Sequence, residues 1–303
     1  MTMKEASTRV KGPPVWLDMD QQALDDAYDQ VVYAPNAARL HERREARSDE
    51  TRRRLGEPKR FAYGPTPIEQ LDVFATSEPN APLAVIIHGG AWKAGRAREF
   101  ADAVEIFVRA GAHCIILDFI NVIEAGGSLF PMADQVRRAI AWLAGNATTF
   151  GGDPNRIHIF GRSSGAHLGG VAITTDWQTD FGLPADINKS ALLSSGMYDL
   201  KPVRLSKRGA YITFTDEMEH ALSPQRHLHR INCPVIVAHG SYETPEFQRQ
   251  AREFAAALEA AGKPVQLLVG AGYNHFELPE TLANPYGVLG RAMLEQMQLA
   301  ASP

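Results

Sequence analysis

Short runs of branched apolar residues alternate, from about residue 70 onward, with longer stretches in which apolar residues recur three and four positions apart. The first pattern predicts buried strands, and the second predicts helices that pack one face against a sheet. The expected strands cover residues 71–76, 83–88, 113–118, 157–160, 191–195, 235–239 and 265–269. The expected helices cover residues 100–110, 132–146 and 247–261. Regular alternation of strand and helix predicts an α/β fold with a mostly parallel, doubly wound sheet flanked by helices.

The first 60 residues are richly charged and lack strand-like alternation apart from the short run VVY. Arginines in HERREAR and TRRRL interleave with acidic residues such as Glu42 and Glu45 at the spacing of helical ion pairs. This pattern favours a solvated helix face over a nucleic-acid or membrane patch. We therefore expect a helical appendage over residues 1–60 and a catalytic domain over residues 61–303.

Within the appendage, residues 20–33 place Leu24, Ala27, Tyr28 and Val31 on one side of a helix. Such an apolar side can dock on a larger domain. We expect this segment to cover the active site in the manner of a lid.

Composition excludes several classes of protein. The chain has 303 residues, of which 45% are hydrophobic and 22% charged, and its net charge is -4. These values are ordinary for a globular enzyme, and the net negative charge does not indicate nucleic-acid binding. Neither a secretory signal nor an apolar run of about 18 residues is recognisable, so we expect a cytoplasmic protein without a membrane partner. Cys114 and Cys233 lie in or beside apolar runs and are interpreted as core thiols.

A candidate nucleophile follows the expected strand RIHIF. Gly161-Arg162-Ser163-Ser164-Gly165 leads from this strand into an apolar helical stretch. A serine in a tight turn between strand and helix adopts a strained backbone, which small neighbours permit, and its hydroxyl is held above the sheet. We expect Ser163 to be the nucleophile of an α/β-hydrolase fold.

An oxyanion hole is predicted at the end of strand LAVIIHG. The following Gly89 and Gly90 offer backbone N–H groups without side chains in the way. Together with the N–H of Ser164, they can bind the negative oxygen of a tetrahedral intermediate. We expect His88 to hold this loop and to take no part in proton transfer.

The general base should come late in the chain, because this fold orders its triad as serine, acid and histidine. His275 lies in the glycine-rich loop GAGYNHF, just past the last expected strand. It is therefore the expected base. For the acid, we prefer Glu243, in the loop after strand VIVAHG, to Glu246 in the first turn of the next helix. Asp199 after the preceding strand is the third candidate.

The motifs HGGAW, GRSSG, TPEFQRQ and GYNHF together resemble the arylformamidase, or kynurenine formamidase, branch of the α/β-hydrolase superfamily. The resemblance extends from about Leu24 to the C-terminus. It implies an oxyanion hole in the glycine loop and a triad acid at the position of Glu243, where the family has aspartate. It also implies cleavage of an N-formyl or N-acyl arylamine.

The chain departs from the family pattern at several positions. Ala91 replaces an aromatic residue of the oxyanion loop, Phe119 replaces a tyrosine, and Arg162 and Ser164 replace the histidine and alanine of the elbow. These changes predict a remodelled pocket. Arg162 could pair with a substrate carboxylate, although an internal ion pair is favoured.

We therefore expect a serine hydrolase that cleaves an amide through Ser163, His275 and Glu243, without metal or organic cofactor. The alternatives are a carboxylesterase acting on small aryl or alkyl esters and a non-catalytic binding module. The expected partner is a small-molecule substrate, and a homodimer stays open. The candidate substrate-binding residues are Trp92, Tyr28, Phe119, Arg162, Trp177 and Tyr273.

Overall fold

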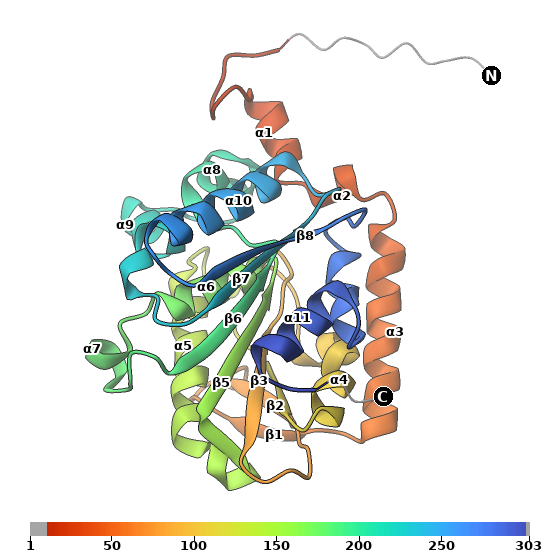
Figure 1. The fold of residues 1–303 in the computed structure, drawn as a ribbon. Coiled ribbons are helices and arrows are strands. Elements are labelled where there is room, and N and C mark those ends of the chain that lie inside the picture. Colours follow the sequence, from red (N-terminus) through yellow and green to blue (C-terminus); the bar gives the residue numbers. More distant parts are fainter. Residues whose placement is uncertain (1–10, 301–303) are drawn as a thin grey trace, which may run out of the picture.

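The computed structural model describes residues 11–300 and contains one eight-stranded sheet (Figure 1). The strand order is β1-β2-β4-β3-β5-β6-β7-β8. The strands are β1 (Lys59–Ala62), β2 (Gln70–Phe74), β3 (Ala81–Ile87), β4 (His113–Leu117), β5 (Gly152–Arg162), β6 (Asn188–Ser194), β7 (Val235–Gly240) and β8 (Val265–Gly270). Strands β3 to β8 pair in parallel with one another. At one edge of the sheet, β2 pairs antiparallel with both β4 and β1.

All seven expected strands are present, which confirms the predicted fold class. The eighth, β1, escaped prediction because it is short and mostly exposed at the sheet edge. Its sequence KRFA therefore carries no buried alternation.

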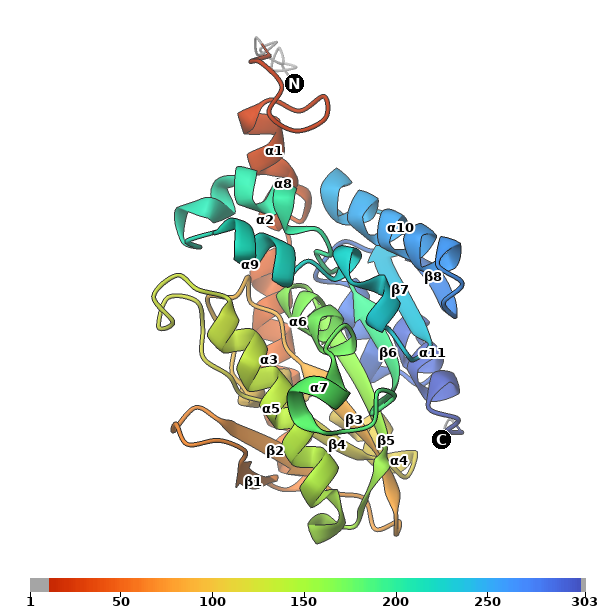
Figure 2. The ribbon, with the colours of Figure 1, turned by 90° about the vertical axis from the view of Figure 1, so that its left-hand side faces the viewer.

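Helices cover both faces of the sheet (Figure 2). The helices of eight or more residues are α3 (Ala37–Leu55), α5 (Phe130–Asn146), α6 (Ser164–Ile173), α10 (Pro245–Ala260) and α11 (Val288–Gln296). The shorter α-helices are α1 (Gln21–Ala27), α2 (Gln30–Tyr33), α4 (Val104–Arg109), α7 (Trp177–Phe181), α8 (Leu200–Leu205) and α9 (Asp216–Ala221). Short 3₁₀ helices include η1 (Ala97–Ala103), η3 (Lys207–Ala210) and η6 (Leu278–Ala283).

Two hydrophobic cores result from the alternation of side chains along the strands. In β3, Leu83, Val85 and Ile87 face the core under α5, α6 and α10, and Ala84 and Ile86 face the core under α4 and α11. Both cysteines are buried as free thiols within these cores.

The described residues before β1 are helical, as expected, and form the three helices α1, α2 and α3. The expected helix over residues 20–33 is broken at Tyr28, because the Asp29 carboxylate accepts from the Val31 N–H and starts α2. Helix α3 then runs along η1 on the outer side of the molecule (Figure 1). Residues 1–10 of the expected appendage lie outside the described residues, and the domain division at residue 60 stays a prediction.

Candidate active site

The loops after the parallel strands meet at the carboxyl edge of the sheet. Strand β5 ends at Arg162, Ser163 forms the turn, and α6 begins at Ser164. Ser163 has φ +54° and ψ −125°, and its N–H donates to the Ser194 carbonyl at 2.8 Å. A left-handed φ is strained for serine, so the surrounding structure must impose it.

Two glycines make this turn possible. A Cβ on Gly161 would lie 2.6 Å from the Gly165 carbonyl oxygen, and one on Gly165 would lie 2.1 Å from that of Ile87. Any side chain at either position would force the helix away from the sheet. The predicted elbow therefore has its structural reason in the close approach of β5, α6 and β3.

His275 contacts both of its expected partners. Its Nε2 lies 2.9 Å from Ser163 Oγ, and its Nδ1 lies 2.9 Å from Glu243 Oε2. Because a carboxylate only accepts, Nδ1 carries the proton and Nε2 is left to accept from the serine hydroxyl. The His275 ring packs edge-on against Phe247 and Phe276. These contacts fix its orientation.

The second carboxylate oxygen of Glu243, Oε1, accepts two hydrogen bonds. Oε1 accepts from the Ser195 hydroxyl and from the Gly240 N–H, both at 2.6 Å. Ser195 is itself buried and has φ +59°. Sequence reasoning missed this residue, since a serine after a strand carries no local signal for a contact 48 positions later.

The other two candidate acids have different partners. Asp199 caps α8 through the Lys201 N–H and pairs with Arg226. Glu246 is buried, pairs with Arg249 and accepts from the Tyr28 hydroxyl. Neither carboxylate contacts His275.

The glycine loop lies against Ser163. A Cβ on Gly89 would come within 3.1 Å of Ser163 Cβ, and Gly90 has φ +126°. Within residues 11–300, the N–H groups of Gly89 and Gly90 donate to no protein acceptor. Ser164 is the first residue of α6, where a helix has no acceptor for the N–H. Gly89 and Gly90 line the same pocket as Ser163, and Ser164 follows it in the chain, so these three N–H groups stay the candidates for the oxyanion hole.

His88 stabilises this loop through a hydrogen bond to its backbone and through ring stacking. Its Nδ1 donates to the Gly89 carbonyl at 2.9 Å, and its ring stacks on Phe119 and Phe100. Burial lowers the pKa of His88 to about 4, so the ring is neutral. These contacts fit the structural role expected for this residue.

A pocket of about 570 Å³ opens over Ser163 and His275. The N-terminal segment supplies Tyr28 and the following three residues to its wall, and α3 supplies His41 and Arg44. Five lysines and arginines line it, against three acidic residues: Arg44, Lys93, Arg162, Lys207 and Arg208, against Asp29, Glu45 and Glu99. The residues before β1 therefore form part of the site, whereas lid motion stays a prediction.

Only two of the six candidate substrate-binding residues, Tyr28 and Arg162, line this pocket. The expectation is corrected for the other four, because each packs elsewhere. Trp92 is buried and donates to His167 Nδ1, Phe119 stacks on His88, Trp177 donates to the Ala172 carbonyl, and Tyr273 lines another hollow.

Arg162 also differs from the favoured expectation of an internal ion pair. Its guanidinium lies over the Phe100 ring, 5.4 Å from the centroid, and forms no ion pair or side-chain hydrogen bond with residues 11–300. Burial lowers its pKa to about 10, so it stays cationic at neutral pH. Asp102 and Glu280 are the carboxylates that act on its charge, and neither lies within 4.0 Å of it.

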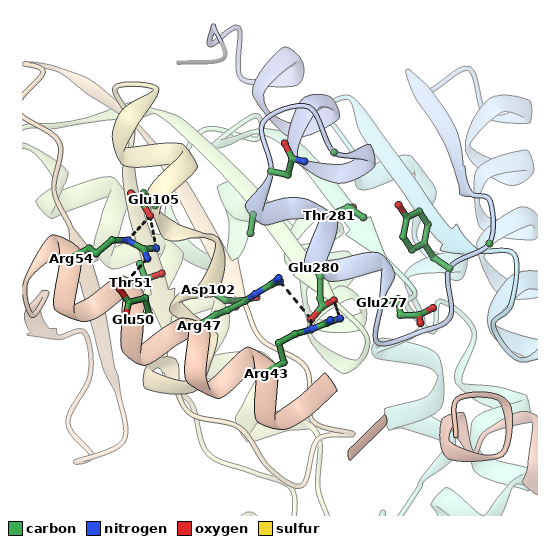
Figure 3. A pocket seen from close by; sticks show the side chains of 15 residues that line it. Arg43, Arg47, Glu50, Thr51, Arg54, Asp102, Glu105, Glu277, Glu280 and Thr281 are labelled. Carbon is green, nitrogen blue, oxygen red and sulfur yellow. Dashed lines mark hydrogen bonds and ion pairs between the residues drawn. The ribbon is translucent and has the colours of Figure 1, made fainter. Parts of the chain in front are cut away.

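A second hollow of about 720 Å³ lies between α3 and η6 (Figure 3), and Ser163 is not among the residues that line it. Its arginines are neutralised within it, since Arg43 pairs with Glu280 and Arg54 with Glu50 and Glu105. It contains no member of the Ser163 cluster. The smaller pocket is therefore the candidate active site.

No helix among the described residues is long and apolar enough to cross a lipid bilayer.

Comparisons with known proteins identify relatives among hydrolases. The BD-FAE family matches residues 71–195. Kynurenine formamidase from Danio rerio is 30% identical over 242 residues, which are 78% of this chain and 80% of that protein. Esterase LipC from Mycobacterium tuberculosis is 28% identical over 70% of this chain and 57% of its own length.

Solved structures show the same fold. Esterase LipW from Mycobacterium marinum superposes with a TM-score of 0.69 at 16% identity, covering 89% of this chain and 90% of that one. The relatives are hydrolases, so the alternative of a non-catalytic binding module is not supported. The resemblance noted from the motifs is confirmed, and the chain is a hydrolase that belongs to the kynurenine formamidase family of the α/β-hydrolase superfamily.

Proposed function

We propose that this enzyme hydrolyses the amide bond of an N-formyl or N-acyl arylamine through a triad of Ser163, His275 and Glu243. The observation that carries the proposal is the continuous chain of contacts from Ser163 Oγ through the imidazole to Glu243 Oε2. Serine, histidine and carboxylate in this order are the requirement for nucleophilic acyl transfer.

The first half of the reaction transfers the acyl group to the enzyme. His275 Nε2 takes the hydroxyl proton of Ser163 as Oγ attacks the carbonyl carbon. The oxyanion that forms accepts from the N–H groups of Gly89, Gly90 and Ser164. His275 then gives its proton to the departing arylamine nitrogen, and the C–N bond breaks.

The second half returns the enzyme to its initial state. Water attacks the acyl carbon and gives a proton to His275, the ester bond to Ser163 breaks, and the proton returns to Oγ. Glu243 keeps the imidazole in the required tautomer and stabilises its charged form without taking the proton.

Two Kynurenine formamidase relatives, from Danio rerio and Salmo salar, favour the amide substrate. Relatives named as esterases favour the alternative, a carboxylic ester of modest size. Both reactions use the same acyl-enzyme, so the substrate profile must decide between them.

The test compares formanilide with p-nitrophenyl acetate. The proposal expects purified protein to release formate from formanilide and a fluorophosphonate probe to label it, with both activities abolished in Ser163→Ala. Release of acid from the ester with formanilide and N-formylkynurenine untouched would leave the esterase alternative. Absence of labelling at Ser163 would remove the triad proposal altogether.

The cytoplasmic location, the homodimer and the absence of a nucleic-acid partner stay predictions. Size-exclusion chromatography with light scattering would measure the oligomeric state directly.

A further inference from the structure

The turn that carries His275 is closed by two of its own side chains. Asn274 Oδ1 accepts from the backbone N–H groups of Phe276 and Glu277, at 2.9 and 3.1 Å. In return, Glu277 Oε2 accepts from the Asn274 N–H at 3.0 Å. The same reciprocal pattern joins a capping residue at a helix start to an acid three residues later. His275 therefore lies inside a small ring of hydrogen bonds.

A residue of the N-terminal segment contacts both members of this ring. Asn36 Oδ1 accepts from Asn274 Nδ2 at 2.9 Å, and Asn36 Nδ2 donates to Glu277 Oε1 at 2.8 Å. The first contact fixes the Asn274 amide with its oxygen toward the two backbone N–H groups, because only the amide nitrogen donates. Although Asn36 is the residue before α3, its side chain does not cap that helix. Its amide is used instead on the turn of His275.

Helix α3 also supports the ring beside His275. The imidazole of His41 packs against Phe276, with 4.8 Å between the ring centroids and 65° between their planes. Phe276 in turn packs edge-on against His275, with centroids 5.2 Å apart. His41 is itself held, since Arg44 donates to its Nδ1 at 3.0 Å. Burial, together with the charge of Arg44, lowers the pKa of His41, so its ring is neutral and accepts.

Ion pairs fix α3 to the chain that follows His275. Arg43 Nε donates to Glu280 Oε1 at 2.7 Å, and Arg47 lies 3.7 Å from the same carboxylate. Figure 3 shows both arginines reaching from α3 toward Glu280. The N-terminal half of α3 is therefore held against a segment that lies 237 positions later in the chain.

His275 needs such support because of its place in the fold. It follows β8, the last strand at the sheet edge, through a loop in which Gly272 has φ +79°. Glycine gives a loop conformational freedom that must be removed elsewhere. A base has to stay within hydrogen-bond reach of both its partners, and a displacement of about 1 Å costs about a hundredfold in rate.

We propose that Asn36 and His41 are positioning residues for the general base. Asn36 acts on His275 through Asn274, and His41 acts on it through Phe276. The inference rests on the proposed function in taking His275 as the base of the triad. The N-terminal segment thus belongs to the framework that orients the triad as well as to the pocket wall.

Asn36→Ala removes both amide contacts and tests the first role. Asn36 is not among the residues that line the pocket over Ser163, so the pocket wall is kept. We expect kcat and kcat/KM for formanilide to fall together by about tenfold, with KM unchanged. The rate of fluorophosphonate labelling should fall by the same factor, since it depends on the base and not on the amide. A merely structural role would lower the melting temperature and leave kcat of the folded enzyme unchanged, which would overturn the inference.

Asn36→Asp is a second variant for the same role. Aspartate is a preferred residue before a helix, so this variant should keep the fold even if Asn36→Ala does not. It places a carboxylate against Glu277, so kcat should fall at low ionic strength and recover in part at about 1 M salt. A kcat equal to that of the wild type at low ionic strength overturns the role of Asn36.

Two substitutions of His41 test the second role. His41→Phe keeps a ring against Phe276 and should hold kcat within about twofold of the wild type, whereas His41→Ala should lower kcat by about fivefold. Because His41 lines the pocket, kcat and the labelling rate are the readouts and KM is not. Equal kcat in the two variants overturns the role of His41.

Arg47→Gln is the matched control, because Arg47 is on the same helix and pairs with Glu280, beyond the turn of His275. It should keep the wild-type kcat and labelling rate. A loss equal to that of Asn36→Ala would assign the effect to displacement of the whole helix and overturn the inference.

Labelling separates this inference from the proposed function. If the wild type is labelled at Ser163 but hydrolyses no formanilide, the amidase proposal fails, and slower labelling of Asn36→Ala still supports the positioning role. If formanilide is hydrolysed and Asn36→Ala is labelled at the wild-type rate, the amidase proposal stands and only the positioning role of Asn36 fails.

Discussion

The Ser195 hydroxyl donates to Glu243 Oε1 across 2.6 Å, leaving Oε2 alone to face His275. A glutamate has one more rotatable bond than the aspartate found in the resembling family, so it needs a second anchor to hold the imidazole steadily. Ser195 and the Gly240 N–H supply that anchor. We regard Ser195 as a positioning residue, because it acts on the triad only through Glu243.

Replacing Ser195 by glycine tests this role. Glycine adopts φ +59° freely, so Ser195→Gly should retain or raise the melting temperature while the lost hydrogen bond lowers kcat/KM by about tenfold. A residue with a merely structural role would lose stability and activity together. Activity equal to that of the wild type would contradict the positioning role.

Glu243 offers a second pair of substitutions. In Glu243→Gln, Gly240 still donates to the amide oxygen, which turns the NH₂ toward His275 and favours the wrong imidazole tautomer. We expect kcat/KM to fall by about 10³- to 10⁴-fold. Glu243→Asp keeps the charge and should lose less. Fluorophosphonate labelling rates should follow the same order, and a larger loss for the aspartate variant would contradict this reasoning.

Gly90 connects backbone conformation to the oxyanion hole. A Cβ at its φ of +126° would lie 2.0 Å from the Ala94 carbonyl oxygen, so Gly90→Ala must displace the loop. Loss of a donor should lower kcat by about 10²- to 10³-fold. Gly126→Ala is the control, because Gly126 also has positive φ but open space around its Cβ position. Equal loss in both variants would point to general destabilisation.

Acid should destabilise the fold through three buried histidines. Burial lowers the pKa of His88, His158 and His167 to about 4, whereas an unfolded histidine titrates near pH 6.5. Between these values the unfolded chain binds more protons, so the free energy of unfolding falls as the pH falls through this window. Each histidine contributes about 1.4 kcal/mol per pH unit there.

Urea denaturation at pH 7.5, 6 and 5 measures this dependence. His158→Gln should show a shallower loss, because one of the three groups no longer titrates. A free energy of unfolding that stays constant from pH 7.5 to 5 would contradict the assignment of neutral buried rings.

The predictable part of the site follows from local sequence. The elbow around Ser163 and the loop with His275 sit at strand ends, where apolar runs and glycines mark both the element and the turn. Strand β1 lacked such a signal. Ser195 was also missed, because its hydrogen bond to Glu243 exists only in the folded chain. The candidate substrate-binding residue Trp177 is instead buried in the core. Sequence alone does not distinguish an aromatic side chain in the core from one that lines a pocket.

The N-terminal segment has a consequence for how specificity can change. Tyr28, just after α1, and Arg44 of α3 line the pocket, whereas Ser163, His275 and Glu243 follow strands of the sheet. One part of the pocket wall is therefore encoded in a stretch of the gene separate from that of Ser163, His275 and Glu243, whereas wall residues such as Lys93 and Arg162 lie next to strands of the sheet. Exchange of residues 20–55 between relatives would change one wall of the pocket and leave Ser163, His275 and Glu243 unsubstituted, so it is a route to chimaeras with altered selectivity.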